Sequence, residues 1–318
     1  MSRLGLLGGT LTALFLFRPS VAASQDKPKV SEEQNVTDLT GLTRKAQSGN
    51  VNAEYELGLR YRKGSSLSRD YVQAAKWYTA AAAQGLAAAE FDLGYMYETG
   101  KGVPQDYRKA VELYRAAAEQ GHATAANNLA TMYDRGRGVA KSLRDAIHWY
   151  KVSAERGDPT GQCNLASIYF TGAGVRRDYQ LAEQWFRAAA ERGLPAAQNN
   201  LSYMYFTGTG VPQDYSEAAK WTRRAAERGY PLAQTDLGYL YEEGKGVALD
   251  YVAAYMWYTL GAVGGDHRAV ERLQSLSRLM TRKQVAEGKA RADARTRSQE
   301  MQTSEDLETE ASAVAFVK

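Results

Sequence analysis

The chain has little of what disulfide-bonded, metal-binding or nucleic-acid-binding proteins require. A single cysteine, Cys163, excludes any disulfide within the chain. The three histidines, His122, His148 and His267, lack the i, i+4 spacing of a helical metal pair, and no cysteine pair supplements them. The formal net charge of +4 is small for a dedicated nucleic-acid binder. We therefore expect no metal, no cofactor and no nucleic-acid partner.

Catalytic motifs are also missing. Gly-x-Gly-Val turns such as Gly100–Val103 lack the preceding strand and the Lys-Ser/Thr ending of a phosphate-binding loop, so we interpret them as turns between helices. Cys163 would need a neighbouring base to act as a nucleophile, and pairing with the nearest histidine, His148, is conceivable but unsupported. No Ser-x-x-Lys occurs together with the partner motifs of a serine β-lactamase. We nominate no catalytic residue and predict that the protein is not an enzyme.

No segment beyond the N-terminus has a hydrophobic run of membrane-spanning length. Leu4–Phe17 is an apolar run of 14 residues that follows Arg3, and Val21–Ala23 is a small-residue site of the kind that signal peptidase accepts. As a helix this run would rise about 21 Å, short of the roughly 30 Å core of a bilayer, although an uncleaved anchor helix is the alternative. We predict a signal peptide at residues 1–23, a flexible linker at 24–36, and an exported protein, periplasmic or secreted, with no integral membrane segment after cleavage.

What the sequence does have is a period of 36 residues. A leucine recurs at this spacing without a change of register, at Leu57, Leu93, Leu129, Leu165, Leu201, Leu237 and Leu273. A fixed period of this size indicates a stacked repeat architecture, in which each unit buries its apolar face against the next. We divide the chain into six repeats: 50–85, 86–121, 122–157, 158–193, 194–229 and 230–265.

Each repeat is predicted to contain two helices. In the second repeat, helix A covers Ala88–Tyr97 with its apolar residues on one face, and Gly100 ends it. Asp106 occupies an N-cap position, and helix B extends to about Gln120. Gly94 and the small residues at equivalent positions predict a close approach of helix A to helix B. A column in helix B is predicted to fill the space between units: Trp77, Leu113, Trp149, Trp185, Trp221 and Trp257.

The helix A pattern, the Gly-x-Gly-Val turn, the Asp-Tyr start of helix B and the Ala-Ala-Glu-x-Gly ending resemble the Sel-one-like repeat (SLR) family, relatives of the tetratricopeptide repeat. The resemblance covers residues 50–283. It implies an all-α, right-handed α-solenoid of six helix-turn-helix repeats with capping helices at both ends. It also implies, for many members, a role as an adaptor or scaffold between proteins at the cell envelope. Secreted members associated with β-lactams carry a cysteine pair in each repeat, which this chain lacks.

The N-terminal end of the solenoid is predicted to be a cap. Ala46 and Gly49 keep the register of the repeats, so Thr37–Gly49 is interpreted as the second helix of an incomplete repeat. The solenoid as a whole is therefore assigned to residues 37–283.

The C-terminal end is predicted to be a second cap followed by a charged segment. Residues 266–283 begin as a seventh helix A and form a partial repeat. Thr281 and Gln284 fit a capping box that opens a basic helix to about Arg297. Residues 284–318 are therefore predicted to be a charged helix and an acidic, disordered tail.

One ridge of helix A varies between repeats while the leucine face stays constant. By analogy with tetratricopeptide stacks, this ridge lines the concave side, where aromatic side chains beside asparagines suit the binding of a protein or peptide. The alternative is that the aromatic side chains pack between neighbouring helices. The candidate partner-binding residues are Phe91, Tyr95, Asn127, Phe170, Asn199, Tyr203, Phe206 and Tyr239.

The sequence thus predicts an exported, non-enzymatic scaffold that binds a protein or peptide in the groove of a repeat solenoid. Its partner is expected to be a signalling or assembly component of the cell envelope, for example a membrane-bound protein. Two alternatives stay open. One is a secreted repeat enzyme that acts on β-lactams or the cell wall. The other is a peptidoglycan- or glycan-binding module, which the aromatic side chains support only weakly.

Overall fold

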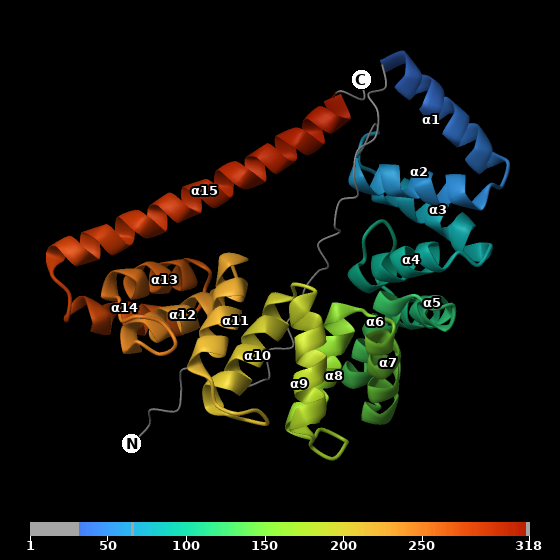
Figure 1. The fold of residues 1–318 in the computed structure, drawn as a ribbon. Helices are drawn as coiled ribbons and strands as arrows, with labels where there is room; N and C mark the ends of the chain where they lie inside the picture. Colours follow the sequence, from blue (N-terminus) through green and yellow to red (C-terminus); the bar gives the residue numbers. More distant parts are fainter. Residues whose placement is uncertain (1–31, 65–66, 316–318) are drawn as a thin grey trace. The chain divides into compact units, whose positions relative to one another are not determined.

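The computed structural model describes residues 32–64 and 67–315, and within these ranges the chain forms helices and turns without a strand. Side chains are described for residues 39–64, 67–298 and Met301. The predicted signal peptide at residues 1–23 lies outside the described residues, as does the predicted linker up to residue 31. Figure 1 shows the described segments as a succession of helices, α1 to α15.

Each repeat contributes two helices of 13 residues, and together they confirm the predicted all-α repeat fold. The helices at the helix A positions are α2 (Val51–Lys63), α4 (Ala87–Thr99), α6 (Ala123–Arg135), α8 (Pro159–Thr171), α10 (Pro195–Thr207) and α12 (Pro231–Glu243). Those at the helix B positions are α3 (Tyr71–Ala83), α5 (Tyr107–Glu119), α7 (Leu143–Glu155), α9 (Tyr179–Glu191), α11 (Tyr215–Glu227) and α13 (Tyr251–Val263).

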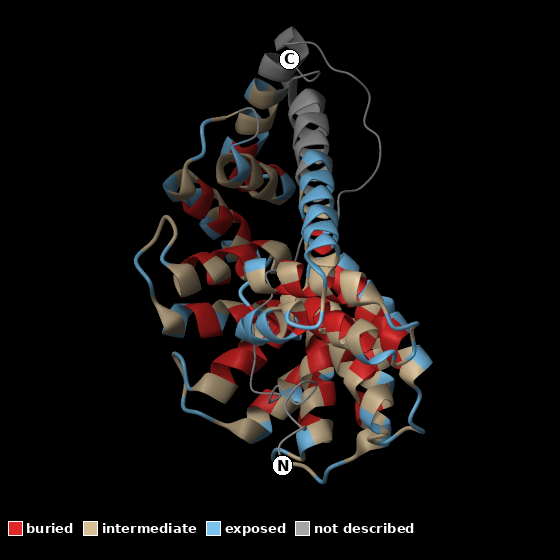
Figure 2. Cartoon of the chain, turned by 90° about the vertical axis from the view of Figure 1, so that its left-hand side faces the viewer, coloured by how far each residue is buried: buried red, intermediate tan, exposed pale blue. Residues whose placement is uncertain are grey.

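The described chain divides into two compact units, one that comprises the residues before Gln162 together with residues 304–315, and one that comprises residues 162–303. Within each unit, helices that follow one another in the sequence pack together. Figure 2 shows buried positions on the helices, whereas exposed positions lie mainly on the connecting turns and on α15 (Arg282–Ala315). Each unit therefore has a core that continues from one helix to the next, as expected of stacked repeats.

The ends of the helices follow the predicted capping residues. Gly100 adopts a φ of 69° after α4, and its N–H donates to the carbonyl oxygen of Met96. This left-handed conformation favours glycine because it lacks a Cβ atom. The carboxylate of Asp106 accepts hydrogen bonds from the backbone N–H groups of Arg108 and Lys109 at the start of α5. Both assignments made from the sequence are confirmed.

In several turns the second glycine lies against the helix B of the preceding repeat. A Cβ atom added to Gly102 would collide with the backbone carbonyl of Tyr71, the first residue of α3. Equivalent collisions would occur between Gly138 and Tyr107 and between Gly246 and Tyr215. The turn therefore carries glycine because backbone meets backbone at this point.

The aromatic column that fills the core lies one residue after the predicted tryptophan column. Trp77, Trp149 and Trp185 are only half-buried, although Trp221 and Trp257 are buried. The fully buried positions of helix B are instead Tyr78, Tyr114, Tyr150, Phe186, Thr222 and Tyr258. One residue turns the side chain by about 100° around the helix axis, which points this second column at helix A.

The predicted close approach of helices A and B is confirmed by this column. A Cβ atom added to Gly58 would lie 2.7 Å from the ring of Tyr78, and one added to Gly238 would lie 2.7 Å from the ring of Tyr258. At Gly94 the corresponding distance to Tyr114 is 3.0 Å. Glycine in helix A therefore provides the space that the aromatic ring of helix B occupies.

Both terminal helices extend further than the sequence predicts. α1 (Glu32–Gln47) begins within the predicted linker, five residues before Thr37. α15 starts at the predicted capping box, in which Thr281 and Gln284 bond reciprocally, but it continues to Ala315 rather than ending near Arg297. No glycine or proline follows Gly288, and the segment is rich in Ala and Glu, so nothing in it interrupts a helix.

Between α13 and α15 lies α14 (His267–Ser277), the partial seventh helix A. Asp266 caps it by accepting a hydrogen bond from the N–H of Arg268. Ala269 and Leu276 bury its apolar face against Ala254 and Tyr258 of α13. Among the described helices, none combines the length and apolar character needed to cross a bilayer.

Candidate interaction surface

The predicted ridge is half-buried along its length. Phe91, Tyr95, Phe170, Asn199, Tyr203, Phe206 and Tyr239 are all of intermediate exposure. Asn127 differs, because it is only 4% exposed, and its carbonyl accepts a hydrogen bond from Thr131 within α6. A buried side chain offers no area to a partner, so Asn127 leaves the candidate surface.

In the unit before Gln162, the ridge carries one stacked pair. The ring of Phe91 lies 4.5 Å from that of His122 with an interplanar angle of 19°, and 6.0 Å from that of Tyr114. The Nδ1 atom of His122 accepts a hydrogen bond from the N–H of Ala125 and so caps α6. Burial lowers the pKa of His122. The neutral imidazole of His122 therefore covers part of the Phe91 ring. Phe91 contributes to packing within the fold as well as to the half-exposed ridge.

In the unit of residues 162–303, the ridge aromatics form a connected strip. The ring of Phe170 lies 6.1 Å from that of Tyr203, and the ring of Phe206 lies 6.0 Å from that of Tyr239. Tyr203 and Phe206 are neighbours on α10, three residues apart and on one face. The structure therefore brings together four of the residues that the sequence singled out.

The floor of the ridge is set by the buried column of helix B. The hydroxyl of Tyr114 donates to Glu98 at 2.6 Å, and that of Tyr258 donates to Glu242 at 2.5 Å. Burial and the adjacent carboxylate raise the pKa of Tyr258 well above its ordinary value. In the fourth repeat the same two positions are Phe170 and Phe186, whose rings lie 6.4 Å apart. The outer residue is therefore acidic above Tyr114 and Tyr258 and apolar above Phe186.

Two cations that the sequence did not single out lie over the end of the strip. The ammonium of Lys245 donates to the hydroxyl of Tyr239 at 3.1 Å and lies 5.3 Å from the ring centre of Phe206. The guanidinium of Arg272 lies 5.4 Å from the ring centre of Tyr239 and 3.6 Å from Glu242. Such contacts stabilise rings in fixed positions. Lys245 belongs to a turn and Arg272 to α14, so the spacing of helix A could not reveal either residue.

A buried charge cluster lies at Asp236, in the first half of α12. Asp236 is 2% exposed, and Arg268 reaches it at 3.3 Å while also binding Asp266 at 2.7 Å. Burial raises the pKa of Asp236 to about 7, although Arg268 and a hydrogen bond from Asn199 oppose this rise. The ridge residue Asn199 therefore has a partner inside the fold. The sequence offered one signal of this cluster, which is an acidic residue, Asp236, at a position of helix A that faces the core.

The lone cysteine is not placed for catalysis. Cys163 is buried, its thiol lies 3.9 Å from the side-chain nitrogen of Asn200, and burial raises its pKa to about 12. A thiol with this pKa is protonated at neutral pH, whereas a nucleophile reacts as the thiolate. Among the described residues, no group of three or more His, Cys, Asp or Glu side chains is arranged to hold a metal ion.

Comparison with known proteins agrees with this architecture. The family model "Sel1 repeat" matches residues 51–86, 87–122, 123–158, 159–194, 195–230 and 231–266, one residue later than the repeats assigned from the period. The comparison with curated proteins found no match.

Two solved structures are similar to this chain. One is c5321, a protective antigen present in uropathogenic Escherichia coli strains displaying an SLR fold, which is 38% identical over 79% of this chain with a TM-score of 0.71. This chain covers 54% of c5321 and so spans about half of its length. The other is a Sel1 repeat protein from Oxalobacter formigenes, 30% identical over 72% of this chain and 99% of that chain, with a TM-score of 0.65. The chain therefore belongs to the Sel1 repeat family, whose repeats generally mediate protein–protein interaction.

Proposed function

We propose that the protein is an exported, non-enzymatic scaffold that binds a protein or peptide along the helix A ridge. The observation that carries this proposal is the aromatic strip formed by Phe170, Tyr203, Phe206 and Tyr239. Half-exposed aromatic rings are the side chains that contribute most to protein interfaces, because they offer large apolar area together with polar edges.

The strip is also held in place before any partner arrives. Phe206 packs on Tyr215 at 5.1 Å, and Phe170 packs on Tyr179 at 5.2 Å, each through the first residue of a helix B. The ammonium of Lys245 donates a hydrogen bond to the hydroxyl of Tyr239. Side chains that are already ordered lose less conformational entropy on binding, which favours affinity.

We further propose that the partner is a component of the cell envelope whose signalling or assembly the scaffold regulates. The N-terminal sequence supports export, since Leu4–Phe17 and Val21–Ala23 have the layout of a signal peptide. The similarity to c5321, which is described as a protective antigen, also supports a location outside the cytoplasm. A fusion of residues 1–40 to alkaline phosphatase tests this part: activity is expected, and an inactive, stably expressed fusion would contradict export.

The ridge is tested by affinity capture from an envelope extract with the purified protein as bait. Tyr203→Ala/Phe206→Ala should lose the partners that the wild type recovers. Tyr205→Ala/Tyr241→Ala is the matched control, because these half-buried tyrosines lie on α10 and α12 but pack under Arg187 and Arg223. Equal recovery by the ridge variant would show that the strip is a packing feature. Steady hydrolysis of a chromogenic β-lactam by the pure protein would favour the enzymatic alternative instead.

A further inference from the structure

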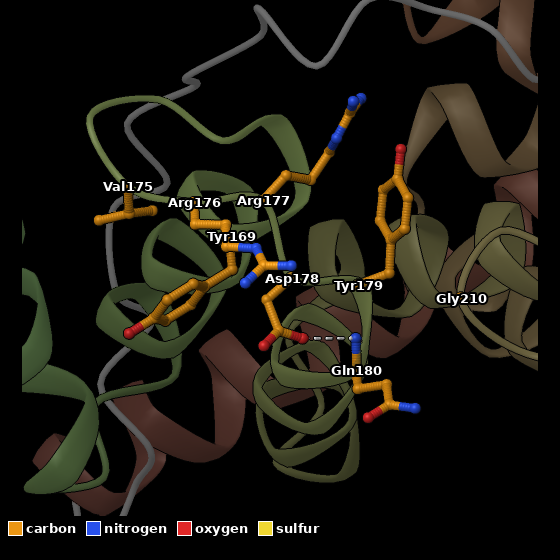
Figure 3. Close-up of a pocket in the computed structure, with 8 residues that line it drawn as sticks. All are labelled: Tyr169, Val175, Arg176, Arg177, Asp178, Tyr179, Gln180 and Gly210. Carbon is orange, nitrogen blue, oxygen red and sulfur yellow. Dashed lines mark hydrogen bonds between the residues drawn. The ribbon is translucent and has the colours of Figure 1, made fainter.

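A cleft of about 750 Å³ opens beside the turn between α8 and α9. Its lining residues are Tyr169, Val175, Arg176, Arg177, Asp178, Tyr179, Gln180 and Gly210. Figure 3 shows two tyrosine rings at either side, with both arginine side chains extending between and above them. All of these residues lie in the unit 162–303, and none belongs to the candidate ridge.

The first difference from the other repeats is the source of the cation over Tyr179. In three other repeats, a basic residue of the following turn lies over the first tyrosine of helix B: Lys101 over Tyr71, Arg137 over Tyr107 and Lys245 over Tyr215, at 5.7–5.8 Å. The equivalent residue for Tyr179 is Thr209, whose side chain is too short to reach across a ring. Instead, Arg177 from the turn just before α9 lies over this ring at 5.5 Å, and the ring of Phe170 lies 5.2 Å from it.

A second break in the repeat pattern lies at Tyr169. The equivalent tyrosines of α4, α6, α10 and α12 each lie under a cation of a helix B. These pairs are Tyr97 with Lys109, Tyr133 with Arg115, Tyr205 with Arg187 and Tyr241 with Arg223. Tyr169 has neither a cation over its ring nor a hydrogen bond to its hydroxyl among the described residues. Tyr169, which has no described cation over its ring, and Tyr179, whose cation comes from the turn before α9, thus face the same cleft.

The charge of the cleft is positive. Arg176 and Arg177 are exposed, and Arg176 stands where other turns have Pro104, Ala140, Pro212 or Ala248. The one acidic lining residue, Asp178, is already engaged, because its carboxylate accepts hydrogen bonds from the N–H groups of Gln180 and Leu181. Two guanidinium groups, two hydroxyls and the Gln180 amide therefore offer donors that suit carboxylates.

We propose that this cleft is a second binding site, for an acidic segment of a partner protein, in which carboxylates pair with Arg176 and Arg177 between the rings of Tyr169 and Tyr179. Like charge disfavours a basic segment here, although Tyr169 has no cation over its ring in the part of the chain that the structure describes. The cleft is open, with Arg176, Arg177 and Gln180 exposed, so an extended chain can cross it. The site adjoins the aromatic strip, because the ring of Tyr179 lies 5.2 Å from that of Phe170, but none of its lining residues belongs to the strip. The proposal stands whether or not that strip binds a partner.

The test is the binding of a fluorescein-labelled peptide, Gly-Ser-Glu-Asp-Phe-Glu-Asp-Ser-Gly, to the full chain, measured by fluorescence anisotropy at about 50 mM NaCl. A second peptide with Gln and Asn in place of the acids is the reference. We expect saturable binding of the acidic peptide and a weakening of about tenfold in Arg176→Ala/Arg177→Ala. Arg278→Ala/Arg282→Ala removes the same charge from exposed positions of the same unit and should stay within about twofold of the wild type.

The Thr209→Lys variant distinguishes binding in a cleft of defined shape from nonspecific attraction between opposite charges. It supplies the cation that covers the first tyrosine in other repeats, so it should close the cleft over Tyr179 and weaken binding several-fold. General attraction predicts stronger binding, because the variant gains positive charge. The proposal is overturned if Thr209→Lys binds more tightly, if both arginine pairs matter equally, or if the acidic peptide binds no better than its neutral reference. Displacement of the peptide by an equal concentration of inorganic phosphate would also overturn it.

Discussion

Repeats five and six share a backbone but fill the space between their helices differently. In repeat six, the ring of Tyr258 packs on Gly238, and its hydroxyl donates to Glu242. In repeat five, Thr222 and Ser202 stand at the equivalent positions, and their hydroxyl oxygens lie 2.5 Å apart. Both pairs are buried. Repeat six therefore fills this space with one large ring beside a glycine, whereas repeat five fills it with two small side chains that bond to each other.

The largest effect is expected where the ring fills the space. Tyr258→Ala removes a fully buried side chain and should lower the free energy of unfolding by about 3–5 kcal/mol. Thr222→Ala removes one methyl and one hydroxyl group and should cost only about 1 kcal/mol. Urea unfolding followed by circular dichroism measures both. Equal losses would contradict the difference between the two repeats.

The next effect concerns the coupling between the facing positions. Thr222→Phe should destabilise the protein by about 1–3 kcal/mol, because the ring meets the hydroxyl of Ser202. Adding Ser202→Ala recreates the combination of Ala166 and Phe186 in repeat four and should restore more than half of the loss. Thermal unfolding of the single and double variants gives the coupling energy. Strict additivity would mean that the two positions do not share one space.

The buried charges shared by repeat six and the partial repeat after it predict a pH dependence that the equivalent positions of repeat five lack. Asp236, Asp266 and Arg268 correspond to Asn200, Tyr230 and Leu232 one repeat earlier. Because the pKa of Asp236 rises from 3.8 to about 7 on folding, the folded state holds its proton more tightly. Its contribution to stability is therefore present below about pH 4 and is lost as the pH rises to 7.

Asp236→Asn should remove this dependence. The melting temperature of the wild type should fall relative to that of the variant as the pH rises from about 4 to 7. Asp266 titrates outside this window, because its partner Arg268 lowers its pKa below the ordinary value. Melting curves of both proteins across this range provide the measurement. A constant difference would show that Asp236 is charged throughout.

The smallest effect concerns the turns. Lys245→Thr gives the turn of repeat six the threonine that repeat five has at the equivalent position, Thr209. The change removes the hydrogen bond to Tyr239 and the contact with Tyr215. The expected loss is about 0.5–1 kcal/mol, as for a partly exposed cation–π contact. Calorimetry on the variant and on Thr209→Lys, which should be neutral or slightly stabilising, compares the two repeats directly.

The sequence alone predicted the repeat, its helix ends and its small residues, because these depend on local rules that recur every 36 residues. It misplaced the core column, since Trp185 and Phe186 are adjacent, both aromatic, and a single-residue change of phase decides which is buried. We therefore expect Trp185→Ala to cost less than Phe186→Ala. The predicted end of the last helix near Arg297 also failed, because polar composition does not by itself stop a helix.

The candidate surface was only partly predictable. Phe170, Tyr203, Phe206 and Tyr239 were found from their variation along one ridge, and they do lie in contact. Asn127 follows the same spacing but is buried, since spacing gives a direction around the helix and not the depth of the neighbouring chain. The cleft at Arg176 and Arg177 depends on Thr209, a residue one repeat away, so no local pattern points to it.

The contact between a turn glycine and the helix of the preceding repeat has a consequence for how such a chain can grow. Gly102, Gly138 and Gly246 each fit against the first helix B residue of the preceding unit, 31 residues earlier in the sequence, so a new unit can pack on whichever unit precedes it. Duplication of a gene segment that encodes 36 residues would supply both halves of that junction at once. Insertions shorter or longer than 36 residues would not supply both halves of the junction. The length of such proteins is thus free to change in whole steps, and each added step brings new ridge residues on which selection can act.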